Sequence, residues 1–172
     1  ESTTQLYNNT VVYNTASAGG AFWFGNDRSS IVNTLVWGNS ASGYDNQVYI
    51  NDDLSEITFE YCNIQGGIYN FLINGSTYNG TYQSNLDIYP YFTSAGNHIY
   101  SVLPNSPCIN TGNPETGLQY QTDIAGNSRI FDDQFDIIDI GAYELQQTIP
   151  TFYVQGEIEE DMLWCADTVR II

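Results

Sequence analysis

Short apolar stretches recur along the first half of the chain, each bounded by Asn, Gly, Ser or Thr. NTVVYNTAS (9–17) and NTLVWGNSAS (33–42) match at Asn, Thr, an apolar residue, Val, an aromatic residue, Asn and Ala-Ser, with one additional glycine in the second copy. YCNIQGG (61–67) follows the second copy by 28 residues, and NQVYIN (46–51) follows GAFWFG (20–25) by 26. No stretch carries apolar residues at i, i+3, i+4 and i+7, so the pattern predicts short strands rather than helices.

A period of 20–30 residues with two short strands per unit is typical of a solenoid of stacked coils. The sequence therefore predicts an all-β fold, a parallel β-helix in which equivalent residues lie about 4.8 Å apart. The second repeat places Phe22 over Val48 and Phe24 over Ile50. We expect two inward columns, with the opposite face as the alternative: Thr10, Thr34 and Cys62 in one, and Val12, Val36 and Ile64 in the other.

The corners of the predicted coils also repeat. Asn14 and Asn39 occupy equivalent positions, where asparagine tolerates left-handed backbone and can bond to the next coil as a ladder. Glycines near the same corners allow tight bends. A two-sheet sandwich is the competing architecture, but it gives no reason for side-chain identities to recur in register.

The pattern divides the chain into three parts. Residues 1–85 form the coils, 86–147 form a terminal coil and loop-rich cap over the exposed end, and 148–172 begin a following module. The alternative for the last part is a crossover strand that completes a sheet in a neighbouring subunit. Because the chain starts in polar, strand-like sequence and stops at DTVRII, we expect a piece of a larger or processed protein.

Charge restricts the partners of this chain. Its 172 residues are 42% hydrophobic, enough for one domain with a core, yet 20 Asp and Glu face only three arginines and no lysine, a net charge of −17. Such a field repels nucleic acid and anionic lipid headgroups. No apolar run approaches the ~20 residues of a membrane span. We therefore expect neither nucleic-acid binding nor direct membrane insertion, whereas divalent cations and neutral polymers are compatible partners.

The three cysteines, Cys62, Cys108 and Cys165, show no close spacing. We interpret them as buried free thiols, with one disulfide and a spare thiol as the alternative. A zinc site is disfavoured, because His98 is the single histidine and there is no CxxC motif.

Four segments in the second half stand in a distinctive order: DIYPYF (87–92), NHIYSVLPNSPCINTGN (97–113), TDIAGNSRI (122–130) and DIGAYE (139–144). Together they resemble the C-terminal end of secreted right-handed parallel β-helix proteins of the choice-of-anchor Q type, abundant in Bacteroidetes and related bacteria. Tyr89 departs from that family, which usually has Asp before the proline. The resemblance covers about 86–144 and implies a right-handed coil and export to the cell surface or the medium.

Within these segments the residue types predict structural roles. Asp123 and Asp139 are placed to accept backbone N–H groups at sharp turns, and Gly112, Gly126 and Gly141 to adopt positive φ. Arg129 is expected to form an ion pair with one of these aspartates or with Glu144.

Enzymatic chemistry finds little support in the sequence, and we assign no catalytic residue. Elimination on uronates needs a basic residue, and the chain has no lysine. Hydrolysis needs a carboxylate pair, for which Asp52–Asp53 and Asp132–Asp133 are the candidates. A metal fits better: DDQFD supplies Asp132, Asp133 and Asp136 close to Asp139, and calcium prefers such oxygen ligands, although no EF-hand pattern is present.

Outward aromatic residues are the remaining candidates for ligand contact. If the columns are as predicted, Tyr13 and Trp37 stack as an outward pair suited to a sugar face, or they pack against a flanking loop. We expect a secreted or surface-attached structural or adhesive module, with other domains of the same polypeptide, neighbouring subunits or surface glycans as partners. The alternatives are a non-catalytic part of a carbohydrate-binding or polysaccharide-degrading protein, and a self-assembling filament or envelope subunit.

Overall fold

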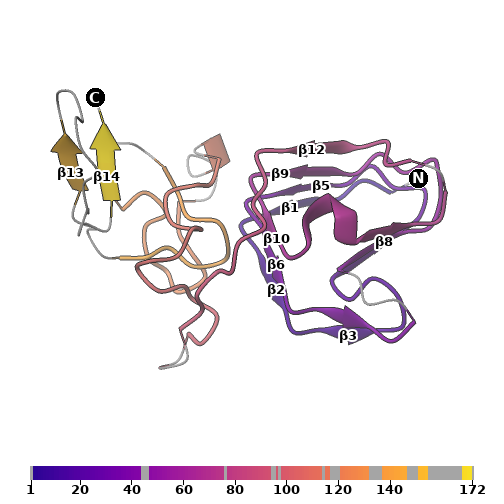
Figure 1. The fold of residues 1–172 in the computed structure, drawn as a ribbon, viewed down its shortest axis with the longest axis horizontal. Helices are drawn as coiled ribbons and strands as arrows, with labels where there is room; N and C mark the ends of the chain where they lie inside the picture. Colours follow the sequence, from indigo (N-terminus) through magenta and orange to yellow (C-terminus); the bar gives the residue numbers. More distant parts are fainter. Residues whose placement is uncertain are drawn as a thin grey trace, which may run out of the picture.

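The computed structural model describes residues 2–43, 47–75, 77–93, 96, 98–113, 115–116, 121–131 and 137–146, together with the backbone of Thr151–Val154 and Thr168–Ile171. All its strand pairs run in parallel, and they stack as a β-solenoid of about three turns (Figure 1). The all-β, parallel prediction is therefore confirmed, and the two-sheet sandwich is excluded. No helix in this described part is long and apolar enough to cross a membrane.

The longest sheet contains β1 (Gln5–Tyr7), β5 (Ser30–Val32), β9 (Thr58–Glu60) and β12 (Thr81–Gln83). Its first residues are paired in the series 5, 30, 58 and 81, so the coils differ in length while the register holds. The middle residues Leu6, Ile31, Phe59 and Tyr82 all pack in the interior of the solenoid. Variation in coil length is therefore absorbed in the corners and loops.

The second sheet consists of β2 (Thr10–Val12), β6 (Leu35–Trp37) and β10 (Asn63–Ile64). Val36 pairs with Ile64 as predicted, but its partner in the first coil is Val11. The two predicted columns were therefore wrong by one residue in the first coil: Val12 pairs with Trp37, and Thr10 pairs with Leu35. A shift of one residue reverses the face, so Val12 and Thr10 point outward.

The third sheet consists of β4 (Phe22–Phe24), β8 (Val48–Ile50) and β11 (Phe71–Ile73), and β3 (Thr15–Ala16) pairs with β7 (Ser40–Ala41). The predicted pairs Phe22–Val48 and Phe24–Ile50 are confirmed. Between them, Trp23 and Tyr49 alternate to the outer face, as the two-residue period of a strand requires.

The predicted ladder between Asn14 and Asn39 is confirmed, but the left-handed backbone lies one residue earlier, at Tyr13 and Gly38. Asn39 Oδ1 accepts hydrogen bonds from the side chain and the backbone N–H of Asn14, at 2.9 and 3.0 Å. A second rung joins Asn33 to Asn8 at 3.1 Å, and both of these residues have positive φ. Asparagine combines tolerance of left-handed backbone with an amide that bonds along the stack, so one residue type serves both needs.

One apolar cluster fills the solenoid. Phe59 lies at its centre with no exposed surface, and its ring contacts those of Phe22, Phe24 and Phe71 at centroid distances of 6.2, 6.3 and 5.1 Å. The short 3₁₀ helix η1 (Gly67–Asn70) adds Ile68 to this cluster. Figure 1 draws η1 inside the outline of the coil, so this helix covers part of the core.

After β12 the chain adds one more rung and then leaves the solenoid. Leu86 bridges Asn63, donates to Cys62 O at 2.7 Å and accepts from Ile64 at 2.9 Å. The following residues, 88–146, are here called the C-terminal segment. The described residues of this segment lie beside the sheet of β2, β6 and β10, on its outer face (Figure 1).

This outer face carries a second apolar cluster, which explains where the C-terminal segment packs. Its buried members come from both partners: Leu35, Trp37, Val102, Cys108, Ile109 and Ile140. The repeat pattern predicts a cap over the exposed end of the stack, whereas the described residues of the C-terminal segment pack along its side. Because Leu35 and Trp37 are apolar and point outward, this sheet is buried on both faces and needs a second layer.

Asn33 fastens the C-terminal segment to the coils. Its Oδ1 accepts from Asn113 N–H at 2.6 Å, its Nδ2 donates to Asn113 O and Thr116 Oγ1, and its backbone oxygen accepts from Gly141 N–H at 2.9 Å. Ala142 N–H donates to Thr10 Oγ1 at 2.9 Å. The segment therefore reaches back to the first coil.

Beyond the segment, β13 (Thr151–Val154) and β14 (Thr168–Ile171) pair in parallel with each other. The expectation of a following module or a crossover strand at 148–172 stays a prediction, as do the boundaries of the three parts.

Candidate binding surface and adjoining pocket

Five aromatic rings meet where the solenoid and the C-terminal segment join, and we call them the aromatic surface: Tyr13, Tyr89, Tyr91, Phe92 and Tyr100. Tyr13 follows β2 at a φ of 55°, in the left-handed region, so its ring turns out of the sheet. The other four belong to the C-terminal segment, where Phe92 forms an antiparallel bridge with Val102.

Ring contacts arrange these rings in two groups, Tyr13 with Phe92 and Tyr100, and Tyr89 with Tyr91. Tyr13 lies 6.1 Å from Phe92 and 6.0 Å from Tyr100, and Phe92 lies 6.2 Å from Tyr100. Tyr89 lies 5.2 Å from Tyr91, at an interplanar angle of 80°. The hydroxyls of Tyr89 and Tyr100 are close enough to Tyr13 that they add to the effect of burial, which is the main cause of the raised pKa of Tyr13. Tyr13 and Tyr89 are 54% and 51% exposed.

A glycine makes room for Tyr13. Gly38 follows Trp37 as Tyr13 follows Val12, and a Cβ on Gly38 would lie 2.5 Å from the Tyr13 ring. Gly38 also has a φ of 67°. In this register Gly38 is the counterpart of Tyr13 rather than an insertion, and only glycine allows the Tyr13 ring to lie over the next coil.

The sequence analysis expected Tyr13 and Trp37 to form one outward pair. Trp37 does face outward, but it is only 9% exposed, and its ring meets Tyr89 edge-on at 5.9 Å. It is paired along the sheet with Val12 rather than with Tyr13. Trp37 thus supports the aromatic surface from below and offers no face to a ligand, which agrees with the alternative of packing against a flanking segment.

The remaining rings of the aromatic surface were not singled out from the sequence. The run IYPYF (88–92) lies within the segment that the sequence predicts to be a cap. The exposure of these rings depends on the sideways packing of the C-terminal segment, which the repeat pattern does not reveal. The two tyrosines that flank Pro90 are the sequence feature that indicates exposed rings here.

Behind this surface, four charged side chains are buried together: Asp123, Arg129, Asp139 and Glu144. Arg129, 3% exposed, donates to the carbonyls of Gly141 and Ala142 at 2.8 and 2.9 Å and lies 4.0 Å from Glu144 Oε2. Its Nε has no partner among the described residues. Burial lowers the pKa of Arg129, but the three carboxylates oppose that shift, so the guanidinium supplies the cation of the cluster.

Asp123 organises a tight turn. Its Oδ1 accepts from the N–H groups of Ala125 and Asn127 at 2.9 and 2.8 Å, and its Oδ2 accepts from Glu144 N–H at 3.0 Å and Asn127 Nδ2 at 3.3 Å. Burial acts to raise the pKa of Asp123, but these bonds together hold it below its usual value. The turn contains Gly126 at a φ of 87°, in the left-handed region.

Two further glycines lie near the cluster. Gly141 has a φ of 121°, and a Cβ there would lie 3.0 Å from Thr10 Oγ1. Gly112 was expected at positive φ, and this prediction was wrong, because it is absent from the left-handed region. Glycine is needed at position 112 because the backbone of Ile138 passes close to it: a Cβ there would lie 2.9 Å from Ile138 O.

Asp139 and Glu144 are the groups whose ionisation is costly. Asp139 accepts from the N–H groups of Asn110 and Leu145 at 2.9 and 2.8 Å, and Glu144 accepts from Asp139 N–H at 3.0 Å. Burial raises the pKa of Asp139 to about 6, and burial with repulsion from Asp139 raises that of Glu144 to about 9. In the folded chain the protonated forms of Asp139 and Glu144 are favoured. Their contribution to stability is complete below the unfolded-state pKa values, about 4, and is lost as the pH rises through 6 and then 9.

We therefore expect the chain to lose stability between pH 5 and pH 9, and Glu144→Gln to reduce that loss. Glutamine keeps an oxygen for Asp139 N–H but cannot ionise. The melting temperature at pH 9 should be higher in Glu144→Gln than in the wild type by about 4 °C, roughly 1–2 kcal/mol for a domain of this size. Scanning calorimetry across this range measures the effect. Glu56→Gln, at an exposed carboxylate, is the matched control, and an identical slope in all three proteins would contradict the prediction.

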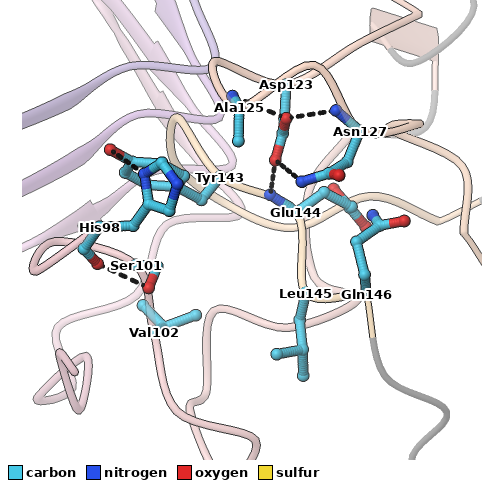
Figure 2. Close-up of a pocket in the computed structure, with 10 residues that line it drawn as sticks. All are labelled: His98, Ser101, Val102, Asp123, Ala125, Asn127, Tyr143, Glu144, Leu145 and Gln146. Carbon is cyan, nitrogen blue, oxygen red and sulfur yellow. Dashed lines mark hydrogen bonds between the residues drawn. The ribbon is translucent and has the colours of Figure 1, made fainter. Parts of the chain in front are cut away.

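A cavity of about 350 Å³ opens beside the charged cluster (Figure 2). His98 and Tyr143 form one wall, with ring centroids 5.1 Å apart and His98 Nδ1 3.4 Å from the Tyr143 hydroxyl. Asp123 and Asn127 lie across from them, and Val102 and Leu145 lie below (Figure 2). The sequence analysis had placed His98 only in a cap motif.

The predicted calcium site falls mostly on residues that the structure does not describe. Asp132, Asp133 and Asp136 lie outside the described residues, and both oxygens of Asp139 accept backbone N–H groups. Within the described ranges no three His, Cys, Asp or Glu side chains come together in a way that would hold a metal ion. Calcium binding thus stays a prediction.

Of the carboxylate pairs considered for hydrolysis, only Asp52–Asp53 is described. Asp52 Oδ1 accepts from Leu54 N–H, Ser55 N–H and Ser55 Oγ at 2.9, 2.9 and 3.0 Å, and its Oδ2 accepts from Asn26 N–H at 2.6 Å. Desolvation acts to raise the pKa of Asp52, but these hydrogen bonds together lower it. Asp52 is thereby occupied in closing a turn.

Two of the cysteines are buried free thiols, as predicted, and Cys165 lies outside the described residues. Burial raises the pKa of Cys62 to about 12, and it also raises that of Cys108. Cys62 packs in the interior cluster and Cys108 in the outer-face cluster, where it accepts from Asn63 Nδ2 at 3.1 Å. Both act as small apolar residues.

Comparison with known proteins adds no family to this description. No family model, no curated protein and no solved structure matches the chain. Any function must therefore be argued from the aromatic surface, the pocket and the charge of the molecule.

Proposed function

We propose that this chain is an adhesive module of an exported or cell-surface protein, and that it binds neutral polysaccharide through the aromatic surface. The observation that carries the proposal is the exposure of the rings of Tyr13, Tyr89, Tyr91 and Tyr100 and the proximity of Tyr89 and Tyr100 to Tyr13. Exposed apolar patches of this kind mark binding sites, and tyrosine offers both a flat ring and a hydroxyl.

Charge favours an uncharged partner. The stretches that carry the rings, 12–14, 88–93 and 99–103, contain no Asp, Glu, Arg or His, although the chain has a net charge of −17. The nearby Asp87 directs its carboxylate to Gly66 N–H, at 2.8 Å. An anionic polymer would be repelled by the overall field, whereas a neutral sugar would lose no ionic hydration on this surface.

The solenoid suits a role as a rigid support. Its strands are held by backbone ladders in every coil, and the rings stand at the junction of two packed layers. The four ordered motifs of the C-terminal segment favour an exported β-helix of the choice-of-anchor Q type, found in Bacteroidetes and related bacteria. A surface protein of this kind would use the module as a stalk or an adhesin.

Retention on insoluble neutral polysaccharide tests this function. The full chain is mixed with cellulose, with an insoluble α-glucan and with a galactan, and bound protein is measured. We expect retention on at least one of them, and the double variant Tyr89→Ala/Tyr91→Ala should bind at least about tenfold more weakly, as for the loss of a hot-spot contact.

Tyr69→Ala is the matched control, because Tyr69 is 98% exposed on η1 and belongs to no ring contact of the aromatic surface. Equal binding of the wild type and the double variant would overturn the assignment of the surface. Release of reducing sugar from any polymer would instead favour the alternative, part of a polysaccharide-degrading protein.

A further inference from the structure

The pocket in Figure 2 has polar groups that the fold leaves partly unused. Asn127 Nδ2 donates to Asp123 Oδ2 at 3.3 Å, and Gln146 Nε2 donates to Ser128 O at 3.0 Å. Among the described residues nothing donates to Asn127 Oδ1 or Gln146 Oε1. The amide nitrogens are therefore committed to the protein, and two amide oxygens remain as acceptors at the pocket.

Asp123 adds negative potential but no acceptor. Its two oxygens already receive four N–H groups, which fills their lone pairs. Because these bonds favour the ionised form, the carboxylate keeps its charge at the pocket wall. A ligand here would thus meet free acceptors and a negative field, and it must supply donors.

The rest of the lining is apolar or aromatic. His98 and Tyr143 present adjoining rings on one wall, and Val102 and Leu145 form an apolar floor. The volume, about 350 Å³, is at the lower end of the range for small-molecule sites. A ring with C–H groups on its face and O–H groups at its edge matches a wall of rings opposite a wall of acceptors.

We propose that this pocket binds the terminal residue of a polysaccharide, as a sugar without acidic groups whose hydroxyls donate to Asn127 Oδ1 and Gln146 Oε1. The proposal rests on the proposed adhesive function and gives it a second contact point. His98, Ser101 and Val102 of the pocket lie on the same short stretch as Tyr100 of the aromatic surface. In this proposal one glycan lies on the rings and ends in the pocket.

The chemistry of the pocket also predicts the order of affinity among sugars. A glucuronate residue brings a carboxylate toward Asp123 and should bind at least about tenfold more weakly than glucose, since like charges at this range cost more than 1.4 kcal/mol when partly desolvated. A glucosamine residue brings an ammonium donor and should bind at least as well as glucose. Raising the salt concentration should reduce the difference between these ligands.

The test is titration of the full chain with three soluble trisaccharides, built of glucose, glucosamine and glucuronate, followed by NMR. His98→Ala and Gln146→Ala remove one wall and one acceptor, and each should weaken the glucose and glucosamine ligands about fivefold to tenfold. Gln83→Ala, an exposed glutamine on β12, is the matched control and should change nothing. Melting curves of the variants confirm that each is folded.

The outcomes separate this proposal from the proposed function. If trisaccharides bind and the two pocket variants bind as the wild type does, or if no trisaccharide binds while the polysaccharide is retained, the pocket proposal is overturned and the adhesive function stands. If glucuronate binds as tightly as glucose, the pocket proposal is also overturned. If His98→Ala and Gln146→Ala weaken trisaccharide binding while Tyr89→Ala/Tyr91→Ala leaves retention unchanged, the pocket is supported and the aromatic surface is not.

Discussion

Replacement of Arg129 by methionine is expected to lower the free energy of unfolding by about 3–5 kcal/mol, as for removal of one partner from a buried charge cluster. Methionine fills similar volume, but it leaves the carbonyls of Gly141 and Ala142 without their donor and removes the cation beside Glu144. The loss should be smaller at pH 5 than at pH 8, because the protonated carboxyls need the cation less. Urea unfolding at both pH values measures this.

Arg28→Met provides the control for this experiment. Arg28 pairs with Glu56 at 3.4 Å, with side chains 54% and 55% exposed, and such surface pairs contribute about 0–1 kcal/mol. A similar loss in Arg28→Met and Arg129→Met would show that the buried cluster does not anchor the C-terminal segment. An unchanged m-value would indicate that the variant exposes the same surface area on unfolding as the wild type does.

Replacement of Phe59 by alanine is the second large effect that we expect, a loss of about 3–5 kcal/mol from the cavity left by a fully buried ring. Phe59 contacts three rings on β4 and β11, the two outer strands of the third sheet, so its loss loosens the interior across several turns. Guanidinium or urea unfolding of the full chain measures the change.

Trp23→Ala is the matched comparison, because Trp23 is a larger aromatic residue that faces outward and is 55% exposed. Its loss should cost about 1 kcal/mol or less, the usual range for surface substitutions. If the two variants lost equal stability, the division between inward and outward positions would be refuted.

Placement of the C-terminal segment has a consequence for binding. A cap over the end of the stack would leave Trp37 and Val12 exposed and would bury Tyr89 and Tyr91. Packing along the side reverses this: Trp37 is covered, and the tyrosines around Pro90 face outward. The aromatic surface thus depends on how the two layers meet rather than on either layer alone.

Individual residues show which parts of this fold the sequence predicts. The parallel solenoid, the pairs Phe22–Val48 and Phe24–Ile50, and the rung between Asn14 and Asn39 follow from recurrence, because stacked coils bring like residues together. Val36 and Ile64 were placed correctly for the same reason. The first coil was misplaced by one residue, since Val11 and Val12 are both valine and either one completes the apolar pattern.

Tertiary structure alone decided the rest. A strand apolar on both faces, such as Leu35–Trp37, signals that something covers its outer side, but the sequence does not identify what does so. The answer depends on long-range contacts, in which Asn33 bonds Asn113 and Thr10 bonds Ala142. By itself, therefore, the amino-acid sequence determined the repeating interior of this protein, because that interior depends on neighbours one coil away. The aromatic surface depends on contacts such as that of Tyr13 with Phe92, and the pocket depends on contacts such as that of His98 with Tyr143, 45 positions further along the chain. Only the folded chain brings these residues together.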